Sequence, residues 1–491
     1  MTSSSPEPPR AGTLLGGPAT AMGLRRELGE LERGLGCRAW IVGGYVRDLL
    51  LGRPARADVD VVLQGAGARE AAEWLRRRWD RRAAVVAFER FGTAQATFAK
   101  EGRERFSVEF VVARAEAYQP ESRKPEVRKG GADEDAWRRD FTVNALLLDG
   151  RGHIWDPTGM GLPDLFQRLL RTPMDPAATF SEDPLRMLRG ARFLAQMELG
   201  LAPGLETAMA EMAPRLAIVS QERIRDELVK LLVAPEPGRG LRLLLRTGLL
   251  RQIAPELAEM AGVDQGGYHL GDVFEHTCLA LGLAPAELLV RLAVLFHDVG
   301  KPRTRAEGAS GPTFLGHPQV GAEVAQQVMG RLRFSGQQRE AVAQLVGLHM
   351  RPISYREDWS DSAVRRLWHD AGSLLTPLME LAEADTRGSA FPLGDQLQRL
   401  RDRLRQVQEE HPAGLASPLG GHRLMAAFDL GPGPWVGRSQ RLLLEAVLEG
   451  ELSAEVEEAS ALAWLELRRS QWWPTEHEPP IRAGKAGADP A

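Results

Sequence analysis

One short stretch limits the possible folds of this chain more than any other. The apolar run Trp40–Val42 leads into Gly43 and Gly44, a pattern typical of a buried strand that turns into a helix. Because glycine has no Cβ, the backbone of such a turn can approach a triphosphate closely. Arg47 would lie on the first helical turn beside it, where a guanidinium can meet anionic oxygens. The stretch therefore predicts a nucleotide-binding turn.

The next predicted strand begins at Asp58 and continues through Leu63. Residues two apart on a strand point to the same face, so Asp58 and Asp60 lie side by side while Val59 packs behind them. Adjacent carboxylates repel each other unless a divalent cation lies between them, and Mg²⁺ prefers such oxygen ligands. The sequence thus predicts a Mg²⁺ site next to the glycine turn.

Together these residues resemble the head-domain signature of the class II tRNA nucleotidyltransferase and bacterial poly(A) polymerase family. The signature reads Gly-Gly-x-Val-Arg-Asp-x-Leu-Leu-Gly, followed by Asp-x-Asp. The resemblance implies template-free addition of C, A or both to the 3′ end of tRNA from CTP and ATP, with release of pyrophosphate. Glu109 falls where the family's strand often carries an acidic residue, which implies a third catalytic carboxylate. A salt-bridged strand residue is the alternative for Glu109.

A second match covers residues 138–145, which are close to the family's Arg-Arg-Asp-Phe-Thr-x-Asn-Ala. It implies that Arg139 pairs with triphosphate oxygens and that Asp140 accepts a hydrogen bond from a ribose hydroxyl. The alternative is a buried ion pair that holds the head together.

A third match begins at Glu182. Asp183 and Arg186 are three residues apart, which makes them neighbours on one helix face and, in isolation, an ordinary intrahelical salt bridge. The resemblance implies instead that the pair reads the Watson–Crick edge of the base, admitting C and A. It also assigns Arg189 and Arg192 to the nucleotide phosphates.

The motif at residues 220–228 resembles the last motif of the family's neck. There Glu222, Arg223 and Glu227 would support the helix that reads the base.

Farther along, adjacent His and Asp follow an apolar helix and precede Gly-Lys, which resembles the HD metal-dependent phosphohydrolase superfamily. Imidazole and carboxylate together suit one or two transition-metal ions, such as Ni²⁺, Mn²⁺ or Fe²⁺. A lone histidine on a helix is more often structural, but four of the ten histidines stand in this context. The implied ligands are His276, His297, Asp298, His317, His349 and Asp385.

The bulk composition sets the remaining limits. The 491 residues are 43% hydrophobic with a net charge of −4, so an RNA-binding surface must be a local patch. Two cysteines, Cys37 and Cys278, form no disulfide framework. No apolar run is long enough for a signal peptide core or a spanning helix, so a cytoplasmic protein without membrane contact is expected. The sequence predicts no oligomeric state.

The implied fold class is α+β: a polymerase-β-like head followed by an all-α neck, an HD body and a tail. The predicted parts are a disordered leader (1–22), the head (23–175), the neck with the nucleotide-template helix (176–250), the HD domain (251–395), a helical tail (396–475) and a disordered tail (476–491).

Three local predictions complete this outline. Val85–Phe98 should form two strands, Pro120–Asp135 a mobile loop, and everything after Arg223 helices without strands.

Four other functions remain open: a poly(A) polymerase, a specialist that adds only CC or only A, mainly an HD phosphohydrolase, and a non-catalytic RNA-binding protein. Intact Asp58, Asp60, Asp183 and Arg186 argue against the phosphohydrolase, and the carboxylates argue against the non-catalytic protein.

Overall fold

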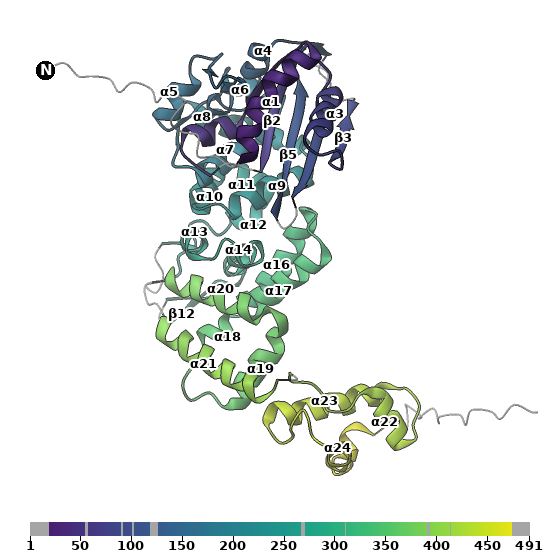
Figure 1. Cartoon of the computed structure of the whole chain (residues 1–491). Helices are drawn as coiled ribbons and strands as arrows, with labels where there is room; N and C mark the ends of the chain where they lie inside the picture. The colour runs from purple at the N-terminus through teal and green to yellow at the C-terminus, as the bar shows by residue number, and fades with distance from the viewer. Residues whose placement is uncertain are drawn as a thin grey trace, which may run out of the picture. The chain divides into compact units, whose positions relative to one another are not determined.

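The computed structural model divides into two compact units, one through residue 255 and one from residue 256 on (Figure 1). The predicted disordered tail and most of the predicted leader lie outside the described residues, whereas Ala19 already belongs to a helix. The predicted domain boundaries stay predictions. The structure describes residues 19–54, 57–89, 92–100, 103–117, 126–266, 271–309, 311–389, 393–412 and 414–473.

The first unit is built on a seven-stranded mixed sheet with the order β3-β4-β5-β2-β1-β8-β9. The central pair β2 and β5 is parallel, and the other neighbours are antiparallel. The two strands predicted within Val85–Phe98 are confirmed as β3 and β4. The strands are β1 Arg38–Val42, β2 Asp58–Gln64, β3 Ala84–Phe88, β4 Thr93–Lys100, β5 Arg103–Val112, β8 Leu147–Leu148 and β9 Ile154–Trp155.

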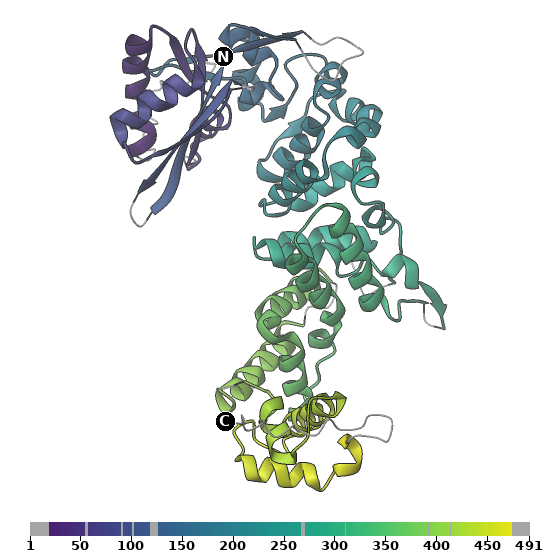
Figure 2. The same cartoon turned by 90° about the vertical axis from the view of Figure 1, so that its right-hand side faces the viewer.

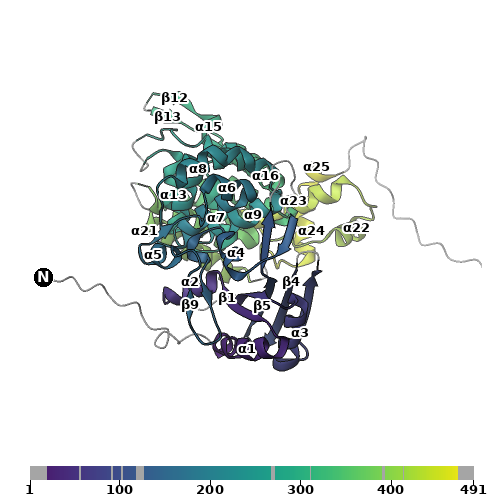
Figure 3. The ribbon, with the colours of Figure 1, turned by 90° about the horizontal axis from the view of Figure 1, so that it is seen from above.

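Two amphipathic helices cover one face of this sheet, α1 (Ala19–Leu35) and α3 (Ala68–Trp79). In α1 the buried residues Leu24, Leu28 and Leu31 recur at helical spacing, which turns one apolar stripe toward the strands. Figures 2 and 3 show both helices on the same side of the sheet. On the opposite face, Trp40, Val42, Val62 and Leu147 are buried in one apolar cluster with Ala132, the first residue of the helix Ala132–Trp137.

The glycine turn connects β1 to α2 (Gly44–Leu50), as the sequence predicted. Gly43 caps the helix with φ 74°, a conformation that favours glycine. Gly52, with φ 64°, follows the helix end and lets the chain turn back toward β2.

The predicted mobile loop Pro120–Asp135 is wrong in its second half. Glu126–Lys129 forms β7, which pairs with β6 (Arg114–Ala117), and α4 (Ala132–Trp137) follows. Residues 118–125 lie outside the described part of the chain. The Pro- and Gly-rich composition predicted a loop. It gave no sign of β7, because β7 depends on pairing with the earlier strand β6.

The remaining elements of the first unit are mainly short helices that pack chiefly against one another. Within the described part of the chain they are η2 Thr142–Asn144, α5 Gly161–Phe166, β10 Leu169–Leu170, α6 Pro176–Glu182, α7 Leu185–Gln196, β11 Gly200–Leu201, α8 Leu205–Met212, η3 Ala213–Ile218, α9 Gln221–Leu232, α10 Pro237–Arg246, α11 Leu249–Ile253 and the start of α12 Pro255–Ala258.

The second unit is helical, but the prediction that no strand follows Arg223 is wrong. A short hairpin pairs β12 (Ala306–Gly308) with β13 (Gly311–Thr313), because two glycines permit a tight turn with φ 121° at Gly311. Its helices are α13 Val273–Leu283, α14 Leu288–Phe296, α15 Lys301–Thr304, α16 His317–Arg331, α17 Gly336–Leu348, α18 Met350–Ile353, α19 Asp361–Ala371, η4 Gly372–Leu374, α20 Leu375–Arg387, α21 Gly394–Glu410, α22 Gly421–Phe428, α23 Pro434–Glu449, α24 Glu458–Glu466 and α25 Arg469–Trp472.

The last helices, α22 to α25, share an apolar cluster of their own. Trp435 and Trp472 lie at its centre, with ring centroids 5.9 Å apart, and Phe428 packs against both. None of the helices in the described residues has the length and apolar character that a membrane crossing requires.

Candidate active site and metal centre

The three predicted catalytic carboxylates lie on the face of the sheet opposite α1 and α3. Asp58 and Asp60 alternate with buried Val59 on β2, and the parallel register places Asp60 beside Glu109 and Asp58 beside Ser107 of β5. Ser107 donates a hydrogen bond to Asp58. Partial burial and the negative charges of Asp60 and Asp58 raise the pKa of Glu109, as expected for carboxylates that crowd one site.

Gly43 brings the predicted nucleotide-binding turn against these carboxylates. A Cβ at Gly43 would lie 3.2 Å from Oδ2 of Asp60 and 3.3 Å from Nη1 of Arg139. Gly44 follows as the first residue of α2. The turn, one catalytic carboxylate and one predicted phosphate-binding arginine therefore meet at one point, although they come from β1, β2 and the segment after α4.

Arg47 differs from the prediction. Its side chain is 1% exposed, and it donates to Oδ1 of Asp48 and, at 2.7 Å, to Oδ1 of Asn144. A guanidinium with these buried acceptors holds α2 to η2 and does not face a ligand in this conformation. The sequence placed it correctly on the first turn of α2 but not on the open side.

Asp140 and Arg189 form a close ion pair, with Nη2 of Arg189 2.6 Å from Oδ2 of Asp140. Burial raises the pKa of Asp140, but the Arg189 charge and hydrogen bonds from Asn144, Arg189 and the Phe141 amide lower this pKa to about 2. The Arg139 side chain is half-buried and donates to Asp135. In this structure Asp140 forms a buried ion pair with Arg189, which was the alternative to a ribose contact.

Asp183 and Arg186 do not share one helix face, and they do not form the intrahelical salt bridge that was the alternative to base reading. Helix α6 ends at Glu182 and α7 begins at Leu185, so Asp183 lies between two helices, where its Oδ1 accepts from the Leu185 amide. Its Oδ2 accepts from Arg223 at 2.8 Å. Arg186 instead donates to Glu182 at 2.9 Å and to the carbonyl oxygen of Arg138 at 2.6 Å.

Helix α9 supports α7, as the neck motif implied. Arg192, expected at the nucleotide phosphates, is buried and donates to Oε2 of Glu227 at 2.6 Å and to Gln196 at 2.9 Å. Arg223 binds Asp183 from the same helix as Glu227. Arg189 remains the most exposed of the predicted phosphate-binding arginines on α7.

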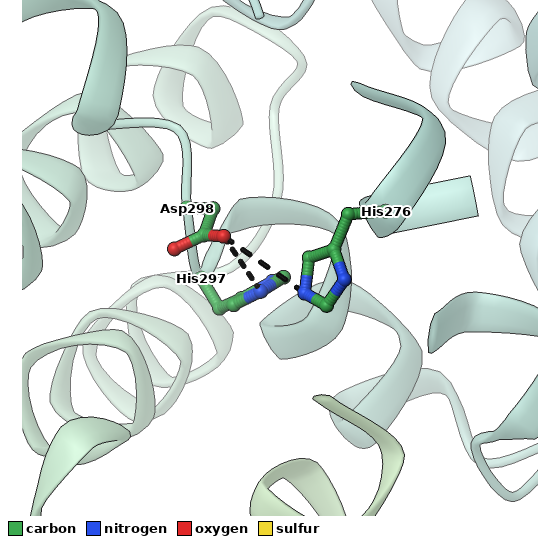
Figure 4. Close-up of side chains that lie close together, drawn as sticks. All are labelled: His276, His297 and Asp298. Atoms are coloured by element: carbon green, nitrogen blue, oxygen red, sulfur yellow. Dashed lines mark ion pairs between the residues drawn. The ribbon is translucent and has the colours of Figure 1, made fainter. Parts of the chain in front are cut away.

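In the second unit all six predicted HD residues converge. The structure forms two groups of three ligand atoms within 4.8 Å of one another, and both contain Asp298: one with His276 and His297, the other with His317 and His349. Asp385 completes the cluster with its Oδ1 2.8 Å from Nε2 of His276. Figure 4 shows His276 and His297 turned toward Asp298. Every ligand comes from a buried helix end or helix face.

Each of the four imidazoles is oriented by a backbone carbonyl. The Nδ1 atoms lie 2.7 to 3.2 Å from the carbonyl oxygens of Gly388, Val294, Phe314 and Val346, which leaves every Nε2 pointing into the cluster. This arrangement fixes the tautomer that a metal ligand needs. Nε2 of His297 is buried, lies 3.2 Å from Oδ2 of Asp298 and has no well-directed hydrogen-bond partner, which fits a position for a cation.

The charges of the cluster are strongly coupled. Burial lowers the pKa of His297, but Asp298 and Asp385 raise it to about 9, while burial and the neighbouring His297 charge lower the pKa of His349 to about 4. Lys301 donates to Asp298 at 2.7 Å. A metal ion binds neutral imidazole, so protons and a metal ion would compete for these histidines.

A cavity of about 600 Å³ opens onto this cluster. Asp298, His317 and Asp385 form part of its wall, together with apolar Phe314 and Leu315. The predicted metal ligands are therefore reachable by a small molecule.

Comparisons with known proteins match segments of both units. Residues 39–171 match a family model described as the poly A polymerase head domain, 199–260 one described as a probable RNA and SrmB-binding site of polymerase A, and 266–388 the HD domain. A CC-adding tRNA nucleotidyltransferase from Thermus thermophilus is 37% identical over 450 residues, which cover 88% of this chain and 95% of that relative. The chain belongs to the tRNA nucleotidyltransferase family.

Other members of this tRNA nucleotidyltransferase family differ in specificity. An A-adding enzyme from Deinococcus radiodurans is 39% identical over 342 residues (66% of this chain, 77% of that protein), and a multifunctional CCA protein from Xanthomonas campestris is 32% identical over 418 residues (79% and 97%). A solved CCA-adding enzyme from Bacillus stearothermophilus in complex with CTP has the same fold, with a TM-score of 0.65 at 24% identity over 92% of this chain and 98% of that one.

Two buried residues that contact the predicted site residues were not predicted from the sequence, Asn144 and Lys301. Asn144 stood inside a quoted motif, but its bonds to Arg47 and Asp140 depend on long-range packing. Lys301 lies three residues after Asp298, a helical spacing that could have indicated their ion pair.

Proposed function

We propose that this chain adds C, A or both to the 3′ end of tRNA, using CTP and ATP and releasing pyrophosphate without a nucleic-acid template. The observation that carries the proposal is the meeting of the Gly43 turn with Asp60, next to Glu109 in register. We expect the reaction in the cytoplasm.

Asp58, Asp60 and Glu109 offer only oxygen atoms, which suits Mg²⁺. When bound, Mg²⁺ lowers the pKa of an attacking hydroxyl and neutralises charge on the leaving pyrophosphate. The Gly43 and Gly44 turn would hold the triphosphate, and Arg139 beside Gly43 and Arg189 beside Asp140 would neutralise its charge. In this proposal Arg47 and Arg192 do not contact the nucleotide. They hold α2 and α7 in place through their buried hydrogen bonds.

Base selection is proposed for the segment between α6 and α7. Asp183, held by Arg223, and Arg186, held by Glu182, supply an acceptor and donors at the start of α7. A ribose contact by Asp140 would require its ion pair with Arg189 to open or to share an oxygen.

The test uses labelled CTP and ATP with Mg²⁺ and three tRNAs: one lacking the CCA end, one ending in CC and one complete. Addition of C, C and A followed by a stop identifies a complete CCA-adding enzyme. Addition of CC alone or A alone identifies a specialist, and continued A addition identifies a poly(A) polymerase.

The Asp58→Ala variant should abolish incorporation while the fold stays intact, and wild-type incorporation by it would refute the proposal. Asp226→Ala is the matched control, because Asp226 is an exposed aspartate of the same unit that pairs with Arg225.

A second function, metal-dependent phosphohydrolysis, is favoured by the His and Asp cluster at the wall of its cavity. The donor set suits Ni²⁺, Mn²⁺ or Fe²⁺. Hydrolysis of p-nitrophenyl phosphate and its bis ester with each ion, lost in Asp298→Ala, would establish it. No turnover with any of the ions would leave the cluster a structural metal site.

A further inference from the structure

The face of the head sheet that bears the carboxylates continues past them to the edge strand β3. Val86 of β3 pairs with Gln95 of β4, Gln95 pairs with Glu109 of β5, and Glu109 pairs with Asp60 of β2. Directly paired residues on neighbouring strands share a face of the sheet. One row of side chains therefore runs from the catalytic carboxylates to the sheet edge.

This edge carries apolar side chains that are exposed in the described part of the chain. Phe88 is 52% exposed and Val86 49% exposed, and both lie on the same face because they are two residues apart. The residues of β4 that point the other way, among them Ala94 and Phe98, are buried under α3, where Trp79 lies 5.2 Å from Phe98. The apolar core of this part of the sheet lies on the opposite face. Packing in that core therefore does not explain why a phenylalanine is exposed at Phe88.

The remaining described side chains of the strip are Thr93, Gln95 and Thr97 of β4, all half-buried. Together with Val86 and Phe88 they offer an aromatic ring, hydroxyls and an amide but no charge. Such a surface suits bases and riboses, whereas phosphates call for basic side chains. A neutral strip also places no cation beside the carboxylates that would compete with a metal ion.

We propose that this strip binds the last nucleotides of the tRNA acceptor strand and that Phe88 stacks on one of their bases. The inference rests on the proposed function, because the reacting 3′-hydroxyl must come to Asp58 and Asp60. Neighbouring strands are about 4.8 Å apart, so β3 lies roughly 14 Å from β2, a distance of a few nucleotides. The strip is continuous with the carboxylates, so the strand that ends at them lies along it.

The test compares Phe88→Ala with Phe88→Trp and with a matched control, Phe166→Ala. Phe166 is 56% exposed in the same unit, but on α5. With a tRNA transcript that lacks its CCA end, Phe88→Ala should raise the KM for tRNA about fivefold or more, since a stacked base is lost. The KM for CTP should stay unchanged, and Phe88→Trp should restore the KM for tRNA.

A second readout needs no catalysis. The same transcript, with 2-aminopurine at its third nucleotide from the 3′ end, should lose fluorescence on binding the wild-type chain and the Phe166→Ala variant, but not on binding Phe88→Ala. Equal KM values for tRNA in wild type and Phe88→Ala, in a wild type that does extend tRNA, would overturn the inference alone. A wild type that extends no tRNA but still quenches the probe overturns the proposed function and leaves the binding strip standing.

Light scattering on the wild type and Phe88→Ala tests whether a second copy of the chain, instead of RNA, covers the strip. If the wild type is a dimer that Phe88→Ala converts to a monomer, the strip is an interface between two copies of the chain and the proposal is wrong. The same oligomeric state in both variants, with the KM effect present, supports the RNA strand.

Discussion

Nη1 of Arg47 lies 2.7 Å from Oδ1 of Asn144, and both side chains are buried. Nδ2 of Asn144 in turn donates to Oδ1 of Asp140 at 3.0 Å, and Asp140 pairs with Arg189 of α7. One amide thus connects the helix after the glycine turn to the helix expected to read the base.

Asn144→Ala should lower the free energy of unfolding by about 2–3 kcal/mol, because Arg47 loses an acceptor and Asp140 a donor in a buried site. Urea unfolding measures this. Asn144→Asp is the informative companion, since it keeps the acceptor for Arg47 but places a second carboxylate against Asp140. Unchanged stability in Asn144→Ala together with a raised KM for CTP would show that Arg47 acts on the nucleotide, as its position in the sequence predicted.

The Asp140 ion pair should make stability depend on pH in the acid range. The folded pKa of about 2 lies below the ordinary value of 3.8, so the contribution is complete above the ordinary value and is lost as pH falls through 2. It amounts to roughly 2 kcal/mol. Urea unfolding at a series of pH values should show a gap between wild type and Asp140→Asn that shrinks toward pH 2. A gap that does not change with pH would show that Asp140 titrates normally.

Gly43→Ala should reduce incorporation about 100-fold, because the new Cβ would press on Asp60 and Arg139 and displace groups at the reacting centre. Gly52→Ala is the control: its φ of 64° is also positive, but nothing lies within 4 Å of the added Cβ. Both variants place an alanine at a positive φ. They differ only in that the new Cβ at position 43 contacts Asp60 and Arg139. Equal losses of incorporation would mean that strain alone is responsible.

Arg223→Ala should weaken discrimination between CTP and UTP by up to about tenfold, because Asp183 loses the partner that orients it. Single-nucleotide incorporation with each triphosphate measures the ratio. Arg225→Ala is the control, since Arg225 lies on the same helix and pairs with Asp226 instead. An unchanged CTP to UTP ratio in Arg223→Ala would show that the orientation of Asp183 by Arg223 plays no part in base selection.

Much of the candidate site could be predicted because it depends on short-range periodicity. The alternation of Asp58, Val59 and Asp60 fixed the shared face of the carboxylates, and the motif context of the histidines gave all six residues of the HD cluster. Alternation also located β3 and β4, and the apolar run before two glycines located the turn at Gly43.

The errors arose where a partner is distant in the chain. Arg47 is buried by Asn144, 97 residues away, and Asp183 is held by Arg223, 40 residues away, where the local sequence offered only Arg186. Likewise β7 exists because β6 supplies its hydrogen bonds. Local pattern predicts which residues face one another on one element, but the choice among several arginines for each carboxylate is made by packing.

Asp298 is shared by both groups of metal ligands, whereas His276 and His349 each belong to one. Asp298→Ala should therefore abolish retention of Ni²⁺ or Mn²⁺ after desalting, while His276→Ala and His349→Ala each weaken it about 10- to 100-fold or remove one of two ions. Metal content by mass spectrometry and titration by calorimetry measure both effects. His369→Ala is the matched control, because this histidine of the same unit contacts the Leu415 carbonyl and lies outside the cluster. Extension of tRNA should persist in all four variants, since the head carboxylates are untouched, and loss of extension in Asp298→Ala but not in His369→Ala would show that the two sites depend on each other.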